Sequence, residues 1–148
     1  MLNLELKSEA SVATLQLDAR RIPESISVVT VKGEMRISSC LICLTQTFAG
    51  WDLNLLIEAI SGFLSGDSDE LAYSSEDGQF TLSALRKDHL ELEARLTMTQ
   101  SIALVSDGWR LGAELYGFSI VESDLVALRD YLSQFLIENG IHTGVEPT

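Results

Sequence analysis

Two cysteines spaced as C-x-x-C, Cys40 and Cys43, are the first residues of this sequence whose types and spacing could perform chemistry. Such a pair carries out thiol–disulfide exchange at a helix N-terminus, where the helix dipole lowers the thiol pKa, or supplies half of a four-ligand zinc site. Here the pair lies within SSCLICLT, a strand-like stretch in which residues three apart point to opposite faces, and no histidine is nearby. We therefore interpret both cysteines as small buried side chains and predict neither a redox centre nor a metal site.

Acid–base chemistry has few candidates. His89 begins the exposed face of a predicted strand and His142 lies near the chain end, and neither has an evident group to orient it. Glu91 and Glu93 share one face of that strand, as a carboxylate pair would. Because the carboxylates of glycosidases flank a cleft, we interpret this pair as part of a solvated face.

The sequence also lacks the motifs of known active sites. It contains no G-x-S-x-G, P-loop, G-x-G-x-x-G or H-E-x-x-H pattern. The loop beginning Asp67-Ser68-Asp69 starts like a calcium-binding loop, but Leu71 and Ala72 stand where an EF-hand needs an acid or amide and a glycine. We predict a protein that is not an enzyme and that binds no metal or cofactor.

Net charge is the strongest compositional signal, at −12 for 148 residues, and it is unevenly placed. Residues 1–49 hold five acids and five bases, residues 50–100 hold ten acids and three bases, and residues 101–148 hold seven and two. Such a chain repels nucleic acid and anionic membranes, lacks the basic groove of a single-strand binder, and attracts a basic protein. The charge thus predicts a basic protein partner, with solubility alone as the alternative.

Localisation follows from what the chain lacks. No apolar run approaches the roughly 20 residues of a membrane span. The first ten residues, MLNLELKSEA, are interrupted by acids where a signal peptide needs an apolar core. We expect a cytoplasmic protein.

Two similar segments organise the elements. Asp52–Leu64 and Asp124–Leu136 share Asp, Leu, Leu, Ser, Phe and Leu at a constant offset of 72 residues. The apolar residues of each recur at the spacing of one helix face, so both predict amphipathic helices.

Alternating and β-branched residues predict strands before each helix, at 2–7, 13–18, 26–32 and 35–48, and then at 71–74, 79–86, 89–98 and 109–121. Within them, Lys32-Gly33-Glu34 predicts a turn, and the two-sided apolar run Cys40–Leu44 predicts a central strand. Residues 99–108 predict a loop, and Gly112 or Gly117 a distortion of the last strand.

Together these patterns predict one α+β domain, 1–140, of roughly ββββα-ββββα order. Its half-repeats are 1–66 and 67–140, the strands form two antiparallel sheets or two halves of one sheet, and the helices pack on them. Residues 141–148 have nothing to bury and predict a flexible tail.

The order of these features resembles small bacterial immunity proteins of the WapI type, which partner the toxins of contact-dependent inhibition systems. The resemblance spans residues 48–135. It consists of DL-x-x-L-x-x-x-I-x-x-F-L (Asp52–Leu64), GQFTLSAL, the alternating HLELEARL, a strand led by Trp109, and SDL-x-x-L-x-x-x-L (Ser123–Leu132). It implies a cytoplasmic, non-catalytic protein that binds and blocks a toxin domain, often a nuclease.

The expected partner-binding residues are acids of the last 99 residues with two aromatic anchors: Asp67, Asp69, Glu70, Tyr73, Glu76, Asp77, Glu91, Glu93 and Trp109. The alternative function is an acidic secretion chaperone that holds an effector segment on a dimer. Such chaperones typically begin with a helix, whereas residues 1–18 here predict strands, so this alternative ranks second.

Overall fold

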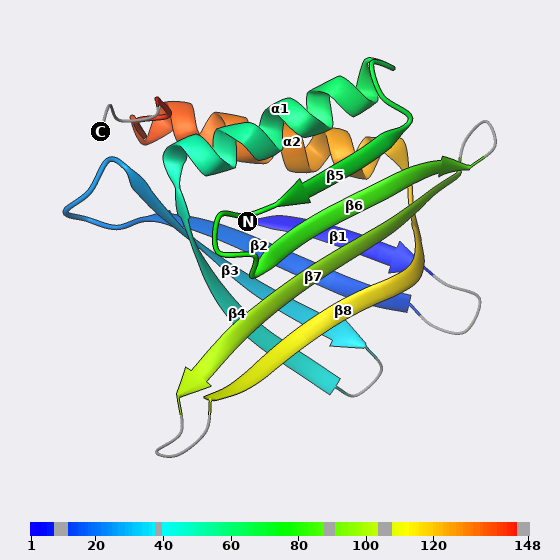
Figure 1. Ribbon diagram of the computed structural model, residues 1–148, viewed down its shortest axis with the longest axis horizontal. Coiled ribbons are helices and arrows are strands. Elements are labelled where there is room, and N and C mark those ends of the chain that lie inside the picture. Colours follow the sequence, from blue (N-terminus) through cyan, green and yellow to red (C-terminus); the bar gives the residue numbers. More distant parts are fainter. Residues whose placement is uncertain (8–11, 38–39, 88–90, 104–107, 145–148) are drawn as a thin grey trace.

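A computed structural model describes residues 1–7, 12–37, 40–87, 91–103 and 108–144. The elements alternate between groups of strands and single helices (Figure 1): β1 Leu2–Lys7, β2 Val12–Arg21, β3 Val28–Ile37, β4 Cys40–Ala49, α1 Gly50–Leu64, β5 Glu70–Ser74, β6 Phe80–Lys87, β7 Glu91–Ala103, β8 Gly108–Ile120 and α2 Glu122–Glu138. The predicted α+β class is confirmed.

All eight strands belong to one antiparallel sheet, in the order β4-β3-β2-β1-β8-β7-β6-β5. The two groups of four strands meet where β1 pairs with β8, a junction whose described register is Lys7 opposite Ser119. The sheet therefore ends at β4 on one side and at β5 on the other, and α1 links these two edge strands.

The two helices lie side by side on one face of the sheet, and the far ends of the long strands project beyond them (Figure 1). The predicted helix stripes are buried, with Leu53, Leu56, Ile60 and Phe63 from α1 and Leu125, Leu128, Leu132 and Leu136 from α2. They pack against the inward residues of the strands, such as Leu17, Val29, Phe48 and Phe80. Burial of this apolar surface is the main stabilising term.

The predicted turn at Lys32-Gly33-Glu34 is wrong, because these residues lie in the middle of β3. Gly33 is buried and pairs with Leu17 on one side and Leu44 on the other. Its charged neighbours alternate to the opposite, outer face of the sheet, so a charged–glycine–charged triplet is consistent with a strand. Residues 35–37 therefore complete β3, and β4 begins at Cys40.

The prediction of a central strand at Cys40–Leu44 is also wrong, since β4 is an edge strand with Leu41 and Cys43 exposed. Cys43 is therefore not a buried side chain, and the side chain of Cys40 lies outside the described part. Residues 99–103 belong to β7 and not to a loop. The register of β7 and β8 shifts by one residue between Ala94–Phe118 and Leu96–Leu115, beside Gly117, as the distortion prediction allows.

The start of the predicted tail is part of the fold. Ile141 is buried, and the His142 N–H donates a hydrogen bond to the Ile26 carbonyl at 2.6 Å. The carbonyl of His142 lies against Gly50, at the start of α1, where a side chain would collide with it. The prediction that residues after 140 bury nothing is therefore wrong for Ile141, while residues 145–148 lie outside the described part.

Candidate functional site

The loop that carries Asp67, Asp69 and Glu70 is fixed by the end of α1. Gly66 adopts a positive φ of 87°, and its N–H donates to the Phe63 carbonyl while the Asp67 N–H donates to the Gly62 carbonyl, at 3.2 and 3.0 Å. This pair of bonds is the Schellman arrangement that ends many helices. The Ser68 hydroxyl then bonds both the N–H and the carbonyl of Glu70. The three acids are exposed on an ordered loop.

The second acidic turn, with Glu76 and Asp77, joins β5 to β6. One oxygen of Asp77 accepts hydrogen bonds from the Ser75 hydroxyl at 2.7 Å and the Gln79 N–H at 3.0 Å. The Phe80 N–H donates in turn to the Ser75 hydroxyl at 3.1 Å, and Gly78 supplies the positive φ that the turn requires. Glu76 and Asp77 are exposed.

A buried carboxylate holds this turn against α1. Asp52 is only 4% exposed, and its two oxygens accept hydrogen bonds from the Tyr73 hydroxyl at 2.8 Å and the Glu76 N–H at 2.8 Å. Its position near the start of α1 also suits its charge, since the helix dipole favours an acid there. The sequence indicates that favourable position but not the two partners, because both lie more than twenty residues farther along the chain.

Tyr73, expected from the sequence as an aromatic anchor for a partner, is buried in the domain. Leu71 and Tyr73 are the inward residues of β5, and Tyr73 is 9% exposed with its ring against Phe80. Burial, together with the hydrogen bond to Asp52 and the charges of Asp52 and Asp77, raises the pKa of the Tyr73 hydroxyl above its ordinary value. Tyr73 is therefore a neutral hydrogen-bond donor inside the domain.

The structure places the two exposed acidic groups at opposite ends of the edge strand β5. Asp67, Asp69 and Glu70 precede or begin the strand and Glu76 and Asp77 follow it, with Cα atoms of its first and last residues about 13 Å apart at strand rise. Ala72 and Ser74 are exposed between them. We name this strand with its two flanking acidic turns, residues 67–77, the acidic edge.

The remaining expected partner-binding residues lie on other strands. In register, Glu91 is opposite Lys87, and Glu93 lies between Leu85 of β6 and Ser119 of β8. Trp109 is opposite Ile102 near the start of β8, with β6 and β7 between it and β5. The side chains of Glu91, Glu93 and Trp109 lie outside the described part, so the acidic edge does not include them.

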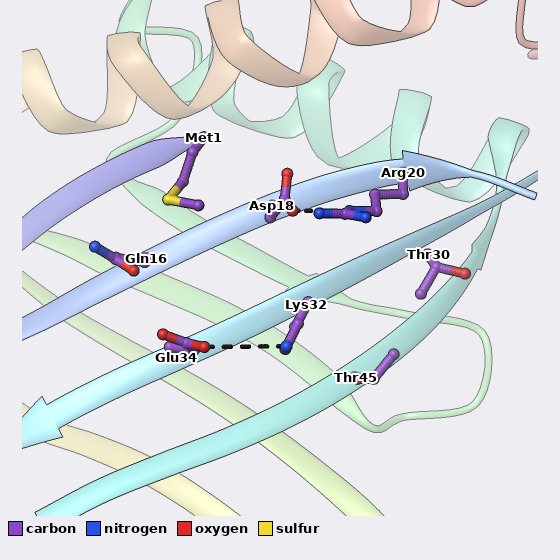
Figure 2. Close-up of a pocket in the computed structure, with 8 residues that line it drawn as sticks. All are labelled: Met1, Gln16, Asp18, Arg20, Thr30, Lys32, Glu34 and Thr45. Carbon is purple, nitrogen blue, oxygen red and sulfur yellow. Dashed lines mark hydrogen bonds and ion pairs between the residues drawn. The ribbon is translucent and has the colours of Figure 1, made fainter.

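A separate hollow of about 380 Å³ lies on the outer face of β2, β3 and β4, the face without helices (Figure 2). Its described lining comprises Met1, Gln16, Asp18, Arg20, Thr30, Lys32, Glu34 and Thr45. The charged groups form two ion pairs, Arg20–Asp18 at 2.9 Å and Lys32–Glu34 at 4.0 Å. No cysteine or histidine belongs to this lining, and its charges are already balanced. The hollow is thus a polar surface depression without an arrangement for nucleophilic or acid–base catalysis.

The described residues bring no three histidines, cysteines or acids together in a way that could hold a metal ion. Comparisons with protein-family models, with curated proteins and with solved structures found no match to this chain. Neither described helix is long and apolar enough to cross a membrane.

Proposed function

We propose that this chain is a non-catalytic protein-binding domain whose acidic edge binds a basic partner. The observation that carries the proposal is the geometry of that edge: two ordered acidic turns stand at the two ends of one exposed edge strand. An edge strand offers backbone hydrogen-bonding groups to an extended segment of another protein. Acids at both ends favour a segment that carries Lys or Arg.

The partner's identity comes from the resemblance to WapI-type immunity proteins. We propose a cytoplasmic immunity protein that neutralises a cognate toxin, with a nuclease domain as the expected class. Nucleases bind a polyanion and are usually basic around the active site, so an acidic inhibitor is electrostatically complementary to them. The same proposal treats residues 1–66 and 67–140 as two equivalent ββββα halves and assigns the partner to the second, which carries the acid excess.

The secretion-chaperone alternative remains second. Its proteins are expected to have a helix ahead of their strands, whereas residues 2–7 and 12–21 here are the strands β1 and β2. A chaperone would also bind an unfolded effector segment, whereas an immunity protein binds a folded toxin domain. The two functions therefore differ in the state of the partner that each requires.

The first experiment is co-purification of this chain with the folded toxin domain encoded beside its gene. In the complex, Asp67→Lys, Asp69→Lys and Glu70→Lys together should slow association about tenfold or more at low salt, and should weaken its dependence on salt. The matched control reverses Glu58, Asp130 and Glu138, three exposed acids of the helices, which changes the net charge equally. The control should slow association far less.

Two results would contradict the proposal. If both triple variants slow association by the same factor, then the total charge of the chain, and not the acidic edge, accelerates binding. If the folded toxin domain does not bind while an unfolded effector segment does, the chaperone alternative is correct. The comparison of the two variants requires that both melt cooperatively, which is expected because exposed charges contribute little to stability.

A further inference from the structure

The second edge of the sheet, β4, lacks the features that normally protect an edge strand. Natural edges are kept from pairing with other chains by short length, charged side chains or proline. The β5 edge is five residues long and is flanked by acids, which disfavour pairing with a second copy of this acidic chain but not with the basic segment proposed above. In contrast, β4 spans ten residues, and its sequence CLICLTQTFA contains neither a charge nor a proline. It is therefore suited to pair with a further strand.

One face of β4 is already used by the fold, where the strand lies against β7 and the core, and described side chains of the other face are exposed. On the inner face Phe48 is buried, with its ring centroid 5.3 Å from that of Phe80. On the outer face Leu41, Cys43, Thr45 and Thr47 are all exposed, Leu41 by 48%. A strand added beside β4 would cover part of this apolar and hydroxyl-bearing surface and extend the sheet.

The charge distribution indicates which molecule would supply the strand that pairs with β4. Residues 1–49, which form β1 to β4, hold equal numbers of acids and bases, while the rest of the chain carries the entire net charge of −12. Two copies that approach through β4 bring uncharged strands and neutral halves together. The strongly acidic β5 edge lies at the other end of the sheet order. A basic segment, by contrast, would find no acid on β4 itself to pair with.

We propose that β4 is a self-association edge, at which two copies of this chain pair through antiparallel β4 strands about a two-fold axis. Such an interface is isologous, the commonest kind in homodimers, and it closes after two copies. It uses neither β5 nor the two acidic turns, so it does not depend on the partner proposed above.

Strand geometry limits the register of this pairing. Directly opposite residues must share a face, so outer-face residues of one copy stand opposite outer-face residues of the other. The registers centred nearest the middle of β4 place Thr45 opposite either Thr45 or Cys43 of the second copy. In both, the two Thr45 side chains are directly opposite or diagonal neighbours, within reach of long charged side chains.

This geometry makes Thr45 the position to test. The mass of the full-length chain in solution should approach twice 16.2 kDa as concentration rises, by sedimentation or light scattering. Thr45→Lys and Thr45→Glu should each raise the dimer dissociation constant about tenfold or more, because each places like charges across the axis. An equimolar mixture of the two variants should recover the dimer at low salt, since Lys then faces Glu. Ser83→Lys, at an exposed site on β6, is the matched control and should dimerise like the wild type.

Hydrogen exchange on the unmodified chain supplies a second measurement that does not depend on any variant. Amides of residues 40–49 should become more protected as concentration rises, while those of residues 70–74 should not change. A wild type that stays monomeric at high micromolar concentration would overturn the proposal. So would a dimer unaffected by both Thr45 variants, or open-ended polymers, which would indicate pairing of β4 with β5.

Discussion

The helices α1 and α2 follow nearly the same sequence pattern, but the structure uses their first turns differently. Asp52, in the first turn of α1, is buried and accepts hydrogen bonds from Tyr73 and Glu76 at the β5 side. Asp124, at the matching position of α2, is half-buried, and its carboxyl hydrogen-bonds the backbone of Val121 at the start of its own helix. The same local sequence therefore anchors a turn in one half and only begins a helix in the other.

The difference arises from the strands that each helix contacts. Near α1, β5 supplies Tyr73 and is followed by a tight turn whose Glu76 N–H donates to Asp52. Near α2, burial raises the pKa of the Asp124 carboxyl above its ordinary value, and the charge of Glu5 in β1 adds to this, while a backbone hydrogen bond with Val121 acts in the opposite direction. Helix α2 is tied to the sheet elsewhere, since the Ala19 N–H donates to the Tyr131 hydroxyl at 2.9 Å. A repeated helix can thus be fixed by unlike contacts.

The largest expected effect concerns the repeated phenylalanines. Phe63 is 1% exposed, with the Arg86 guanidinium 4.8 Å from its ring centroid, whereas Phe135 is only partly buried against the core. Phe63→Ala should lower the free energy of unfolding by about 3–5 kcal/mol, the range for core phenylalanines. Phe135→Ala should cost about 1–2 kcal/mol, because less apolar surface is lost. Urea unfolding of both variants checks this, and equal losses would contradict the unequal burial.

The next effect concerns the start of α1. A Cβ added at Gly50 would collide with the His142 carbonyl and lie 2.8 Å from Cγ2 of Ile141. Gly50→Ala should therefore lower the free energy of unfolding by about 3 kcal/mol, the upper part of the usual range for overpacking. The matched control is Gly62→Ala in the same helix, where no atom lies within 4 Å of the added carbon. That change should stabilise the domain by about 0.5–1 kcal/mol through helix propensity. Thermal melting of both variants gives the signs, and a neutral Gly50→Ala would show that the 141–142 segment can move away.

How much of this could be predicted from the sequence depends on the range of the interaction. The helix stripes depend on spacing within fifteen residues, and Leu53, Leu56, Ile60 and Phe63 are buried as the spacing predicts. The position of β4 at an edge depends on how eight strands are ordered, which no single strand encodes, so its apolar run indicated a central strand. Lys32 and Glu34 made Gly33 resemble a turn, because the sequence did not show that β2 and β4 lie on either side of it.

The acidic edge shows the same limit. Exposure of Asp67, Asp69, Glu70, Glu76 and Asp77 follows from their type and turn-like surroundings. Their arrangement at the two ends of an edge strand required the sheet order, and the burial of Tyr73 required the face of β5 that meets α1. The sequence thus indicated the acids of the candidate site but not its shape or its aromatic contacts.

The smallest expected effects compare the stability lost when Asp52 or Asp124 is replaced by asparagine. In Asp52→Asn one carboxylate oxygen becomes an amide that cannot accept from Tyr73 or from the Glu76 N–H, so about 1–3 kcal/mol of stability should be lost. Asp124→Asn should cost nothing or slightly stabilise the domain at neutral pH, because burial and Glu5 together disfavour the charged form more than the Val121 backbone hydrogen bond favours it.

The pH dependence of Asp124→Asn has a definite sign. Since the pKa of Asp124 is raised in the folded state, the stability that its neutral form contributes is fully present below the ordinary carboxyl pKa and is lost as pH rises through the raised value. Any advantage of Asp124→Asn over the wild type should therefore appear at neutral pH and disappear in acid, where the wild-type carboxyl is already neutral. Urea midpoints of both proteins at neutral pH and near pH 3 measure it, since about pH 3 lies below the ordinary pKa of an aspartate. A loss at neutral pH comparable to that of Asp52→Asn would show that the bond between Asp124 and the Val121 backbone outweighs burial and the charge of Glu5, and that the two halves are fixed more alike than expected.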